Sequence, residues 1–255
     1  MATRHLHRRS SSDVPGRIGV VILAAGRGER FGHGPKSALE LAGKSLLEHV
    51  VASMGASRRV AEMVVTAPET FFEETAELLR AAQPSVPTRV IEGGSTRQAS
   101  AHAGVAAVSA DVEWVAVTDV ARPLVPDATL DSLMAAVLDA SSASDWQPCG
   151  AVPVVPIIDS VHLIAADRCA LIAPFERDRL CAAQTPQFFH RECLVEAHES
   201  AARDGAECTD DVGAVARLGG RVLAVPGDSA NIKITYARDL EVAAALHARA
   251  LGASS

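Results

Sequence analysis

The chain has 255 residues, of which 48% are hydrophobic and 22% charged, a composition typical of globular proteins with a sizeable core. Its net charge of -7 and its low aromatic content of 4% exclude a general nucleic-acid binder, which needs basic surface and rings for base stacking. The longest apolar run, near residues 20–25, is far shorter than the ~20 residues of a membrane span, so we expect a cytoplasmic protein with no membrane partner.

Strand-like and helix-like segments alternate along the first two thirds of the chain. Residues 1–16 are polar and aperiodic, which predicts a disordered N-terminal tail. Apolar runs typical of buried strands follow at residues 18–25, 61–68, 88–93, 113–119 and 150–156. The segments between them predict helices at residues 45–56, 69–82, 95–108 and 127–140. This alternation predicts a mostly parallel sheet with helices on both faces.

The pattern changes after Pro156. Short alternating segments predict a protruding two-stranded arm at about residues 156–182. The remaining predicted elements are a helix near residues 190–205, a short helix from Asp210, strands at 221–227 and 231–235, and a final helix at 239–251. No linker signal interrupts this part, so we expect one domain over residues 17–250 that carries the arm.

The cysteines give no sign of a metal or disulfide framework. There are five, an odd number, and no two of them form a C-x-x-C pair. We therefore expect buried thiols.

A glycine-rich turn follows the first predicted strand directly. It contains the cations Arg27, Arg30 and Lys36. Glycines let backbone N–H groups approach an anion closely, and the cations neutralise it, so the turn predicts a phosphate site that would suit a triphosphate. An ordinary turn between strand and helix would explain the glycines but not the cations. Phe31 occupies the third glycine position of a dinucleotide-binding fingerprint, which disfavours a dehydrogenase.

Six motifs in order resemble one enzyme family. They are A-A-G-x-G-x-R followed by P-K at residues 24–36, and the segments 92–100, 119–123, 185–189, 209–211 and 231–235. Together they resemble 2-C-methyl-D-erythritol 4-phosphate cytidylyltransferases over about residues 17–250. The resemblance implies a three-layer α/β/α Rossmann-like nucleotidyltransferase fold, similar to GT-A folds, with a mostly parallel sheet and a β-arm. It also implies transfer of a cytidylyl group from CTP to the alditol phosphate, with release of pyrophosphate, in non-mevalonate isoprenoid synthesis.

The same resemblance implies the site residues. It assigns catalysis to Arg30, Lys36 and Lys233, which would stabilise charge at the α-phosphate, and Mg²⁺ binding to Asp119. The implied nucleotide-binding residues are Ala24, Ala25, Gly26, Gly28, Gly93, Gly94, Arg97, Ser100 and Asp119. The implied acceptor-binding residues are Ser160, Arg177, Thr185 and Thr209. The arm would reach the pocket of a second subunit, so a homodimer is expected.

The residues by themselves leave alternatives open. Asp119 could cap the next turn, and Lys233 could be a solubilising charge at a strand edge. Arg97 could contact phosphate or cap its region, and Arg122 could anchor its turn or the nucleotide.

Departures from the family pattern gather on the acceptor side. Thr118 replaces a usual histidine, Ser37 a common glutamine, and Ser160 and His162 stand where threonine and lysine are frequent. One alternative function is therefore cytidylyl transfer to another alditol phosphate, such as ribitol 5-phosphate. A second alternative is a catalytically silent nucleotide-binding relative.

Overall fold

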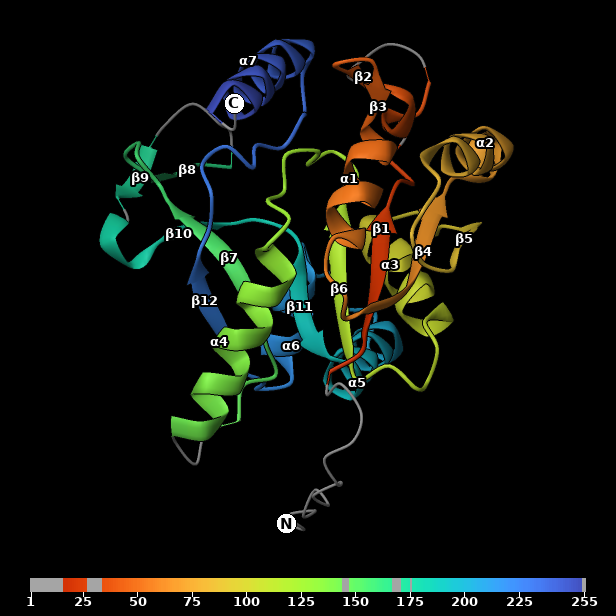
Figure 1. Ribbon diagram of the computed structural model, residues 1–255. Coiled ribbons are helices and arrows are strands. Elements are labelled where there is room, and N and C mark those ends of the chain that lie inside the picture. The colour runs from red at the N-terminus through yellow and green to blue at the C-terminus, as the bar shows by residue number, and fades with distance from the viewer. Residues whose placement is uncertain (1–15, 27–33, 144–146, 167–170, 175, 254–255) are drawn as a thin grey trace.

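A computed structural model describes residues 16–26, 34–143, 147–166, 171–174 and 176–253. A central eight-stranded sheet lies between two layers of helices (Figure 1). The predicted disordered tail lies outside the described residues, except for Gly16. None of the helices among the described residues is both long and apolar enough to cross a membrane.

Four parallel strands form one half of the sheet. They are β5 (Thr88–Glu92), β4 (Val60–Ala67), β1 (Ile18–Leu23) and β6 (Trp114–Asp119), in this order across the sheet. The chain runs outward from β1 through β4 to β5 and then returns to β6 on the other side of β1. Their carboxyl ends therefore meet at one edge, where ligands of open α/β sheets bind.

The other half of the sheet is mixed. β11 (Gln187–His190) is antiparallel to both of its neighbours, β6 and β7 (Gly150–Pro156). β10 (Cys181–Ala183) pairs antiparallel with the end of β7, and β12 (Val222–Pro226) pairs parallel with β7. The mostly parallel sheet is thus confirmed, with two antiparallel strands that the alternation of segments did not predict.

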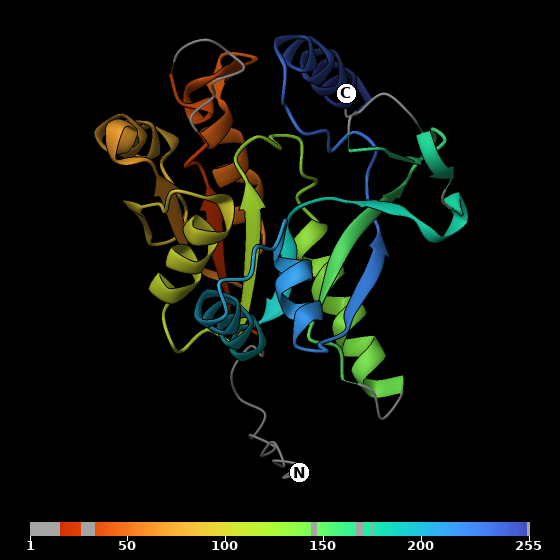
Figure 2. The ribbon, with the colours of Figure 1, turned by 180° about the vertical axis from the view of Figure 1, so that it is seen from behind.

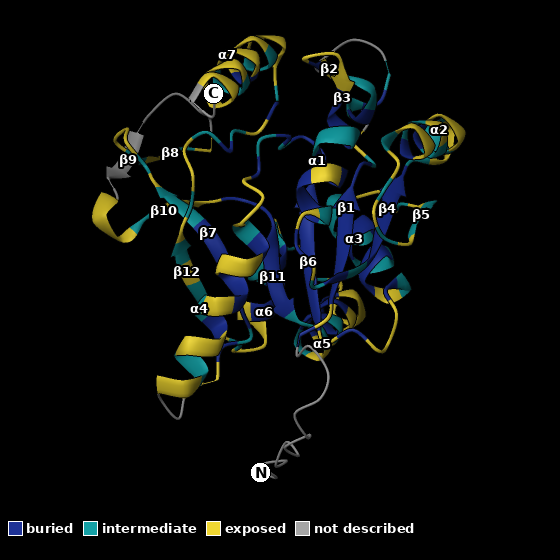
Figure 3. Ribbon diagram, in the orientation of Figure 1, coloured by how far each residue is buried: buried dark blue, intermediate teal, exposed yellow. Residues whose placement is uncertain are grey.

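Side-chain alternation on the strands divides the core into two halves. Val20 and Ile22 of β1 face one half, which is closed by α1 (Leu46–Gly55), α2 (Phe72–Ala82) and α4 (Thr129–Ala143). Val21 and Leu23 face the other, closed by α3 (Arg97–Ala107), α5 (Arg191–Arg203) and α6 (Asp211–Arg217). Figure 2 shows this second layer from behind, and Figure 3 shows the buried strands between the two layers. The predicted three layers are confirmed.

Small elements surround the sheet. A 3-10 helix (Glu69–Phe71) precedes α2, and β2 (Glu40–Leu41) and β3 (Lys44–Ser45) form a short hairpin before α1. The C-terminal helix α7 (Ala237–Ala253) lies beyond the carboxyl ends of the strands and contributes the buried Ala243 to the core (Figure 1).

A second two-stranded sheet occurs in the region predicted as an arm. β8 (His162–Ile164) pairs antiparallel with β9 (Leu171–Pro174), apart from the central sheet. A 3-10 helix (Arg177–Arg179) then leads back to β10. Ile158, at the base of this region, is 85% exposed.

Two sequence-based expectations are wrong. Residues 231–235 are irregular rather than a strand, because the backbone of Asn231 bonds to Asp228 and to side chains instead of to a ladder. The four described cysteines are free thiols, but Cys181 on β10 is exposed and the other three are only partly buried, so the expectation of buried thiols is wrong.

Candidate active site

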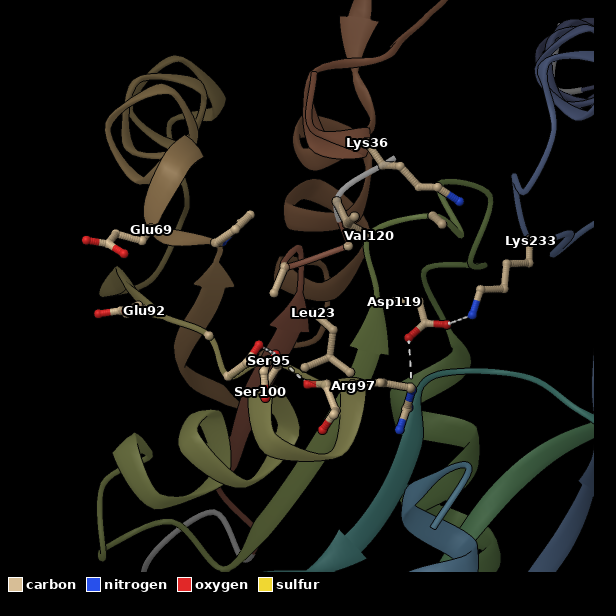
Figure 4. A pocket seen from close by; sticks show the side chains of 17 residues that line it. Leu23, Lys36, Glu69, Glu92, Ser95, Arg97, Ser100, Asp119, Val120 and Lys233 are labelled. Carbon is tan, nitrogen blue, oxygen red and sulfur yellow. Dashed lines mark hydrogen bonds and ion pairs between the residues drawn. The ribbon is translucent and has the colours of Figure 1, made fainter. Parts of the chain in front are cut away.

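A cavity of about 820 Å³ opens at the carboxyl ends of β1, β4, β5 and β6. The loop after β1 contributes Ala25, Gly26 and Lys36, and the loop after β5 contributes residues 93–96. Arg97 and Ser100 come from α3, Asp119 from the end of β6, and Lys233 from the segment before α7 (Figure 4). The topology of the sheet therefore gathers residues from both ends of the sequence, from Ala25 to Lys233.

Two of the predicted catalytic cations lie at the same rim of this cavity. Lys36 begins a 3-10 helix (Lys36–Ala38), and its Nζ donates a hydrogen bond to the carbonyl oxygen of Ile234 at 3.0 Å. Ile234 follows Lys233, whose own Nζ donates to Asp119 Oδ2 at 2.5 Å. Lys233 is thus directed into the cavity and is not a solubilising charge at a strand edge. Arg30 and Gly28, also predicted for this site, lie outside the described residues.

The backbone of Asp119 and its carboxylate have different partners. Its N–H donates to Thr185 Oγ1 at 3.0 Å, which fixes the end of β6. Among the described residues, its carboxylate contacts two cations: Lys233 at Oδ2, and Arg97 Nε at 3.6 Å from Oδ1. The side chain is only 10% exposed. The carboxylate is therefore part of a charged cluster in the cavity and does not cap the following turn.

Arg97 connects the cavity to the interior. One nitrogen, Nε, faces Asp119, and another, Nη2, donates to Asp211 Oδ2 at 2.9 Å. Burial by itself lowers the pKa of Arg97, but the negative charges of Asp211 and Asp119 raise this pKa above its ordinary value. The guanidinium therefore stays positive at the cavity wall.

The loop after β5 brings its backbone close to the loop after β1. A Cβ on Gly93 would lie 2.7 Å from Ala25 Cβ and 3.0 Å from Ser100 Oγ. Ser100 Oγ donates to the carbonyl oxygen of Thr96 at 2.9 Å, which fixes the start of α3. Only a glycine at position 93 allows the two loops to lie this close to each other. The nearby Ala24 is fully buried beneath the cavity, whereas Ala25 and Gly26 line it.

The predicted acceptor-binding residues are spread more widely. Thr185 is buried beside Asp119, and Thr209 is exposed just before α6. Ser160 and Arg177 are exposed in the arm region, where Arg177 Nη1 donates to the carbonyl oxygen of Ile158 at 3.0 Å. None of the four lines the cavity in the part of the chain that the structure describes.

Arg122 anchors the segment that carries Lys233. Its Nη1 donates to the carbonyl oxygen of Asn231 at 2.6 Å, and Ile234 N donates to the carbonyl oxygen of Ala121 at 2.8 Å. Asn231 Nδ2 in turn donates to the carbonyl oxygen of Thr185 at 3.0 Å. Of the two roles left open for Arg122, the structure supports the anchoring one.

Several residues near the site were not singled out from the sequence. Glu69 and Glu92 line the cavity, and Asp211, Gln187 and His198 lie behind Arg97. The motifs 185–189 and 209–211 contain Gln187 and Asp211, but nothing in the sequence shows that the side chain of Gln187 binds the backbone of Asp211 or that Asp211 binds Arg97.

A family model and several related proteins agree on the family of this chain. Residues 18–249 match the family of 2-C-methyl-D-erythritol 4-phosphate cytidylyltransferases. The protein of that name from Streptomyces avermitilis is 40% identical over 243 residues, which cover 91% of this chain and 92% of that protein. Its counterpart from Frankia casuarinae is 40% identical over 91% of this chain and 82% of its own. The crystal structure of the Thermus thermophilus enzyme of this name matches with a TM-score of 0.67 and 35% identity, over 89% of this chain and 97% of that one.

Proposed function

Because the chain belongs to the family of 2-C-methyl-D-erythritol 4-phosphate cytidylyltransferases, it is a CTP-dependent nucleotidyltransferase, and we propose that Lys36, Lys233 and Arg97 are the described cations that act on the phosphates of CTP. The acceptor is 2-C-methyl-D-erythritol 4-phosphate, and the product is 4-CDP-2-C-methyl-D-erythritol, an intermediate of non-mevalonate isoprenoid synthesis. Arg30, in the same loop as Lys36, is proposed to join them.

The chemistry explains why cations gather here. An oxygen of the acceptor phosphate attacks the α-phosphorus of CTP, and the bond from this phosphorus to the oxygen that bridges to the β-phosphorus breaks. Pyrophosphate leaves with that oxygen. Two polyanions must meet, and negative charge spreads over the α-phosphoryl oxygens, so positioned cations lower the barrier without a covalent enzyme intermediate.

One observation carries this proposal. Lys36 Nζ donates a hydrogen bond to the carbonyl oxygen of Ile234, the residue after Lys233. This bond joins the loop after β1 to the segment before α7. It places two ammonium groups at the rim of the cavity that also contains Asp119. Gly93 and Gly94 let the loop after β5 pack closely against Ala25 and Ala99 on the opposite wall, where we propose that the cytosine and ribose bind with Ser100.

The donor set suits Mg²⁺ bound together with the nucleotide. Asp119 offers hard carboxylate oxygens next to the cations, and Mg²⁺ in such sites takes one or two carboxylates together with substrate phosphates and water. We propose Asp119 as the protein ligand. When bound, Mg²⁺ neutralises phosphate charge, while Lys36, Lys233 and Arg97 orient the triphosphate.

We propose that a second subunit completes the acceptor site. Ser160 and Arg177 are exposed outside the described cavity wall, and Ile158, Leu163 and Ile164 expose apolar surface in the same region. A homodimer in which this region reaches the partner's cavity would bury these side chains and bring the two polar residues to the acceptor. Thr185 and Thr209 are proposed to complete the site near the nucleotide.

The test is pyrophosphate release from CTP with different acceptors and with Mg²⁺. We expect turnover with 2-C-methyl-D-erythritol 4-phosphate, and none when either substrate or the metal ion is left out. Faster turnover of ribitol 5-phosphate would contradict the acceptor assignment. Calorimetric binding of CTP without product from any acceptor would instead support the catalytically silent relative.

The metal assignment has its own test. Asp119→Asn keeps the shape of the side chain but removes its charge, so we expect the Mg²⁺ concentration for half-maximal activity to rise about tenfold or more. Asp127→Asn, a change at an exposed position beyond the same motif, is the control. An unchanged Mg²⁺ dependence in Asp119→Asn would exclude the proposed ligand.

A further inference from the structure

A buried carboxylate behind the cavity has no role in the chemistry described so far. Asp211, at the start of α6, is fully buried. Its Oδ2 accepts from Arg97 Nη2 at 2.9 Å and its Oδ1 accepts from His198 Nε2 at 3.0 Å. A buried charge is costly unless it is paired and hydrogen-bonded. Both oxygens of Asp211 meet that condition, and one of the two partners is a residue of the cavity wall.

Two residues of one short segment, Thr185 and Gln187, bind the backbone of the two aspartates that Arg97 contacts. Thr185 Oγ1 accepts from the backbone N–H of Asp119 at 3.0 Å. Gln187 Oε1 accepts from the backbone N–H of Asp211 at 3.0 Å, and Gln187 Nε2 donates to Asp210 Oδ2 at 2.9 Å. The carboxyl end of β6 and the start of α6 are thus fixed relative to each other, because both bind the segment from Thr185 to Gln187. The guanidinium of Arg97 spans the gap between them.

We propose that Asp211 is a positioning residue for cytidylyl transfer: it holds Arg97 by one edge so that the other edge faces Asp119 and the phosphates of the nucleotide. The proposal rests on the proposed function. A planar guanidinium can serve two carboxylates at once, which a single ammonium cannot do in the same way. In the absence of Asp211 the side chain of Arg97 would have one anchor instead of two.

The opposite charges of Asp211 and Arg97 support this geometry. Burial raises the pKa of Asp211, but the hydrogen bond from His198 and the charge of Arg97 outweigh it, so the pKa lies below its ordinary value. Asp211 is therefore ionised at neutral pH. His198 donates from Nε2, and its Nδ1 is buried without a hydrogen-bond partner among the described residues.

Asp211→Asn removes the negative charge that faces Arg97 and keeps nearly the same side-chain shape. The amide has one acceptor oxygen for the two donors, Arg97 Nη2 and His198 Nε2, so it cannot accept from both as the carboxylate does. We expect kcat/KM for CTP to fall about 10²-fold, because a misplaced positioning group costs about this much. The matched control is Val215→Ala, which removes buried apolar atoms from the same helix but has no contact with Arg97. It should lower Tm and leave kcat/KM unchanged.

A double variant distinguishes positioning from a purely structural role. If Asp211 acts through Arg97, then Arg97→Ala combined with Asp211→Asn should be no slower than Arg97→Ala alone. Losses that multiply, or wild-type kcat/KM in Asp211→Asn at a lowered Tm, would overturn the proposal.

A second substitution covers the case in which Asp211→Asn does not fold. Arg97→Lys keeps the positive charge at a partly exposed position, and we expect it to lose nearly as much activity as Arg97→Ala. Full activity in Arg97→Lys would overturn the two-edge arrangement. A wild-type enzyme that forms no product would count against the proposed function, whereas an active wild type with unaffected variants counts against the role of Asp211 alone.

Discussion

Lys36 Nζ donates a hydrogen bond to the carbonyl oxygen of Ile234 at 3.0 Å, although 198 positions separate the two residues. This contact closes the rim of the cavity between the loop after β1 and the segment before α7. It also aligns Lys36 with Lys233, so the two ammonium groups face the same space. The proposed mechanism depends on this convergence, because phosphate repulsion falls when fixed cations surround the reacting atoms.

Removal of either lysine should abolish most of the activity without unfolding the protein. In Lys36→Ala and Lys233→Ala we expect kcat/KM to fall by roughly 10²-fold to 10³-fold, since loss of one positioned donor typically costs about 3 kcal/mol in the transition state. Steady-state pyrophosphate release measures this loss, and circular dichroism checks the fold. Lys44, the remaining lysine, is exposed on β3, so Lys44→Ala is the control and should retain full activity. Near-wild-type rates in both cavity variants would contradict the mechanism.

A methyl group at Gly94 should weaken nucleotide binding. An added Cβ would lie 2.9 Å from the backbone carbonyl carbon of Ala99 and closer still to its Cβ. The backbone of α3 cannot yield as a flexible side chain would, so the loop must move away from its place on the cavity wall. We expect Gly94→Ala to raise the Kd of CTP about tenfold or more, measured by calorimetry. Gly252→Ala, where nothing lies within 4 Å, should bind CTP normally.

The stability of the protein should depend on the ionisation of Asp211. The folded-state pKa of this carboxyl is lowered from its ordinary value of 3.8. The unfolded chain therefore binds the proton more readily, so Asp211 contributes stability above about pH 4 and loses it as the pH falls through the folded pKa. Urea unfolding between pH 3 and pH 7 should show a shallower decline of the unfolding free energy in Asp211→Asn than in the wild type. Identical declines would show that Asp211 is not an anchored charge in the folded state.

The arm region should govern the oligomeric state. Ile158 is 85% exposed and Leu163 is 49% exposed, an apolar surface that a partner subunit would cover. We expect the wild type to sediment as a dimer and Ile158→Asp to sediment as a monomer with reduced turnover, since the partner would no longer complete the acceptor site. Leu251→Asp is the control, because Leu251 is 60% exposed at the end of α7. A wild-type monomer with full activity would contradict the proposed dimer.

Local patterns along the chain determined the α/β architecture and the position of the site. The continuous apolar run at 18–23 predicted a strand buried on both faces, and the burial of Val20 and Val21 on opposite faces of β1 agrees with it. Parallel strands place their following loops at one edge. Gly26 of the glycine-rich turn, Gly93 and Asp119 were therefore expected near one another, and all three line the same cavity.

Tertiary contacts decided the features that local pattern does not encode. Residues 231–235 alternate like a strand, yet Arg122 and Ala121 hold them as an irregular segment. Phe188 becomes part of a central strand because β6 and β7 leave an open hydrogen-bonding position between them. The partnership of Arg97 with Asp211 joins residues 114 positions apart. The energy of such contacts depends on distance and burial, which exist only once the chain has folded.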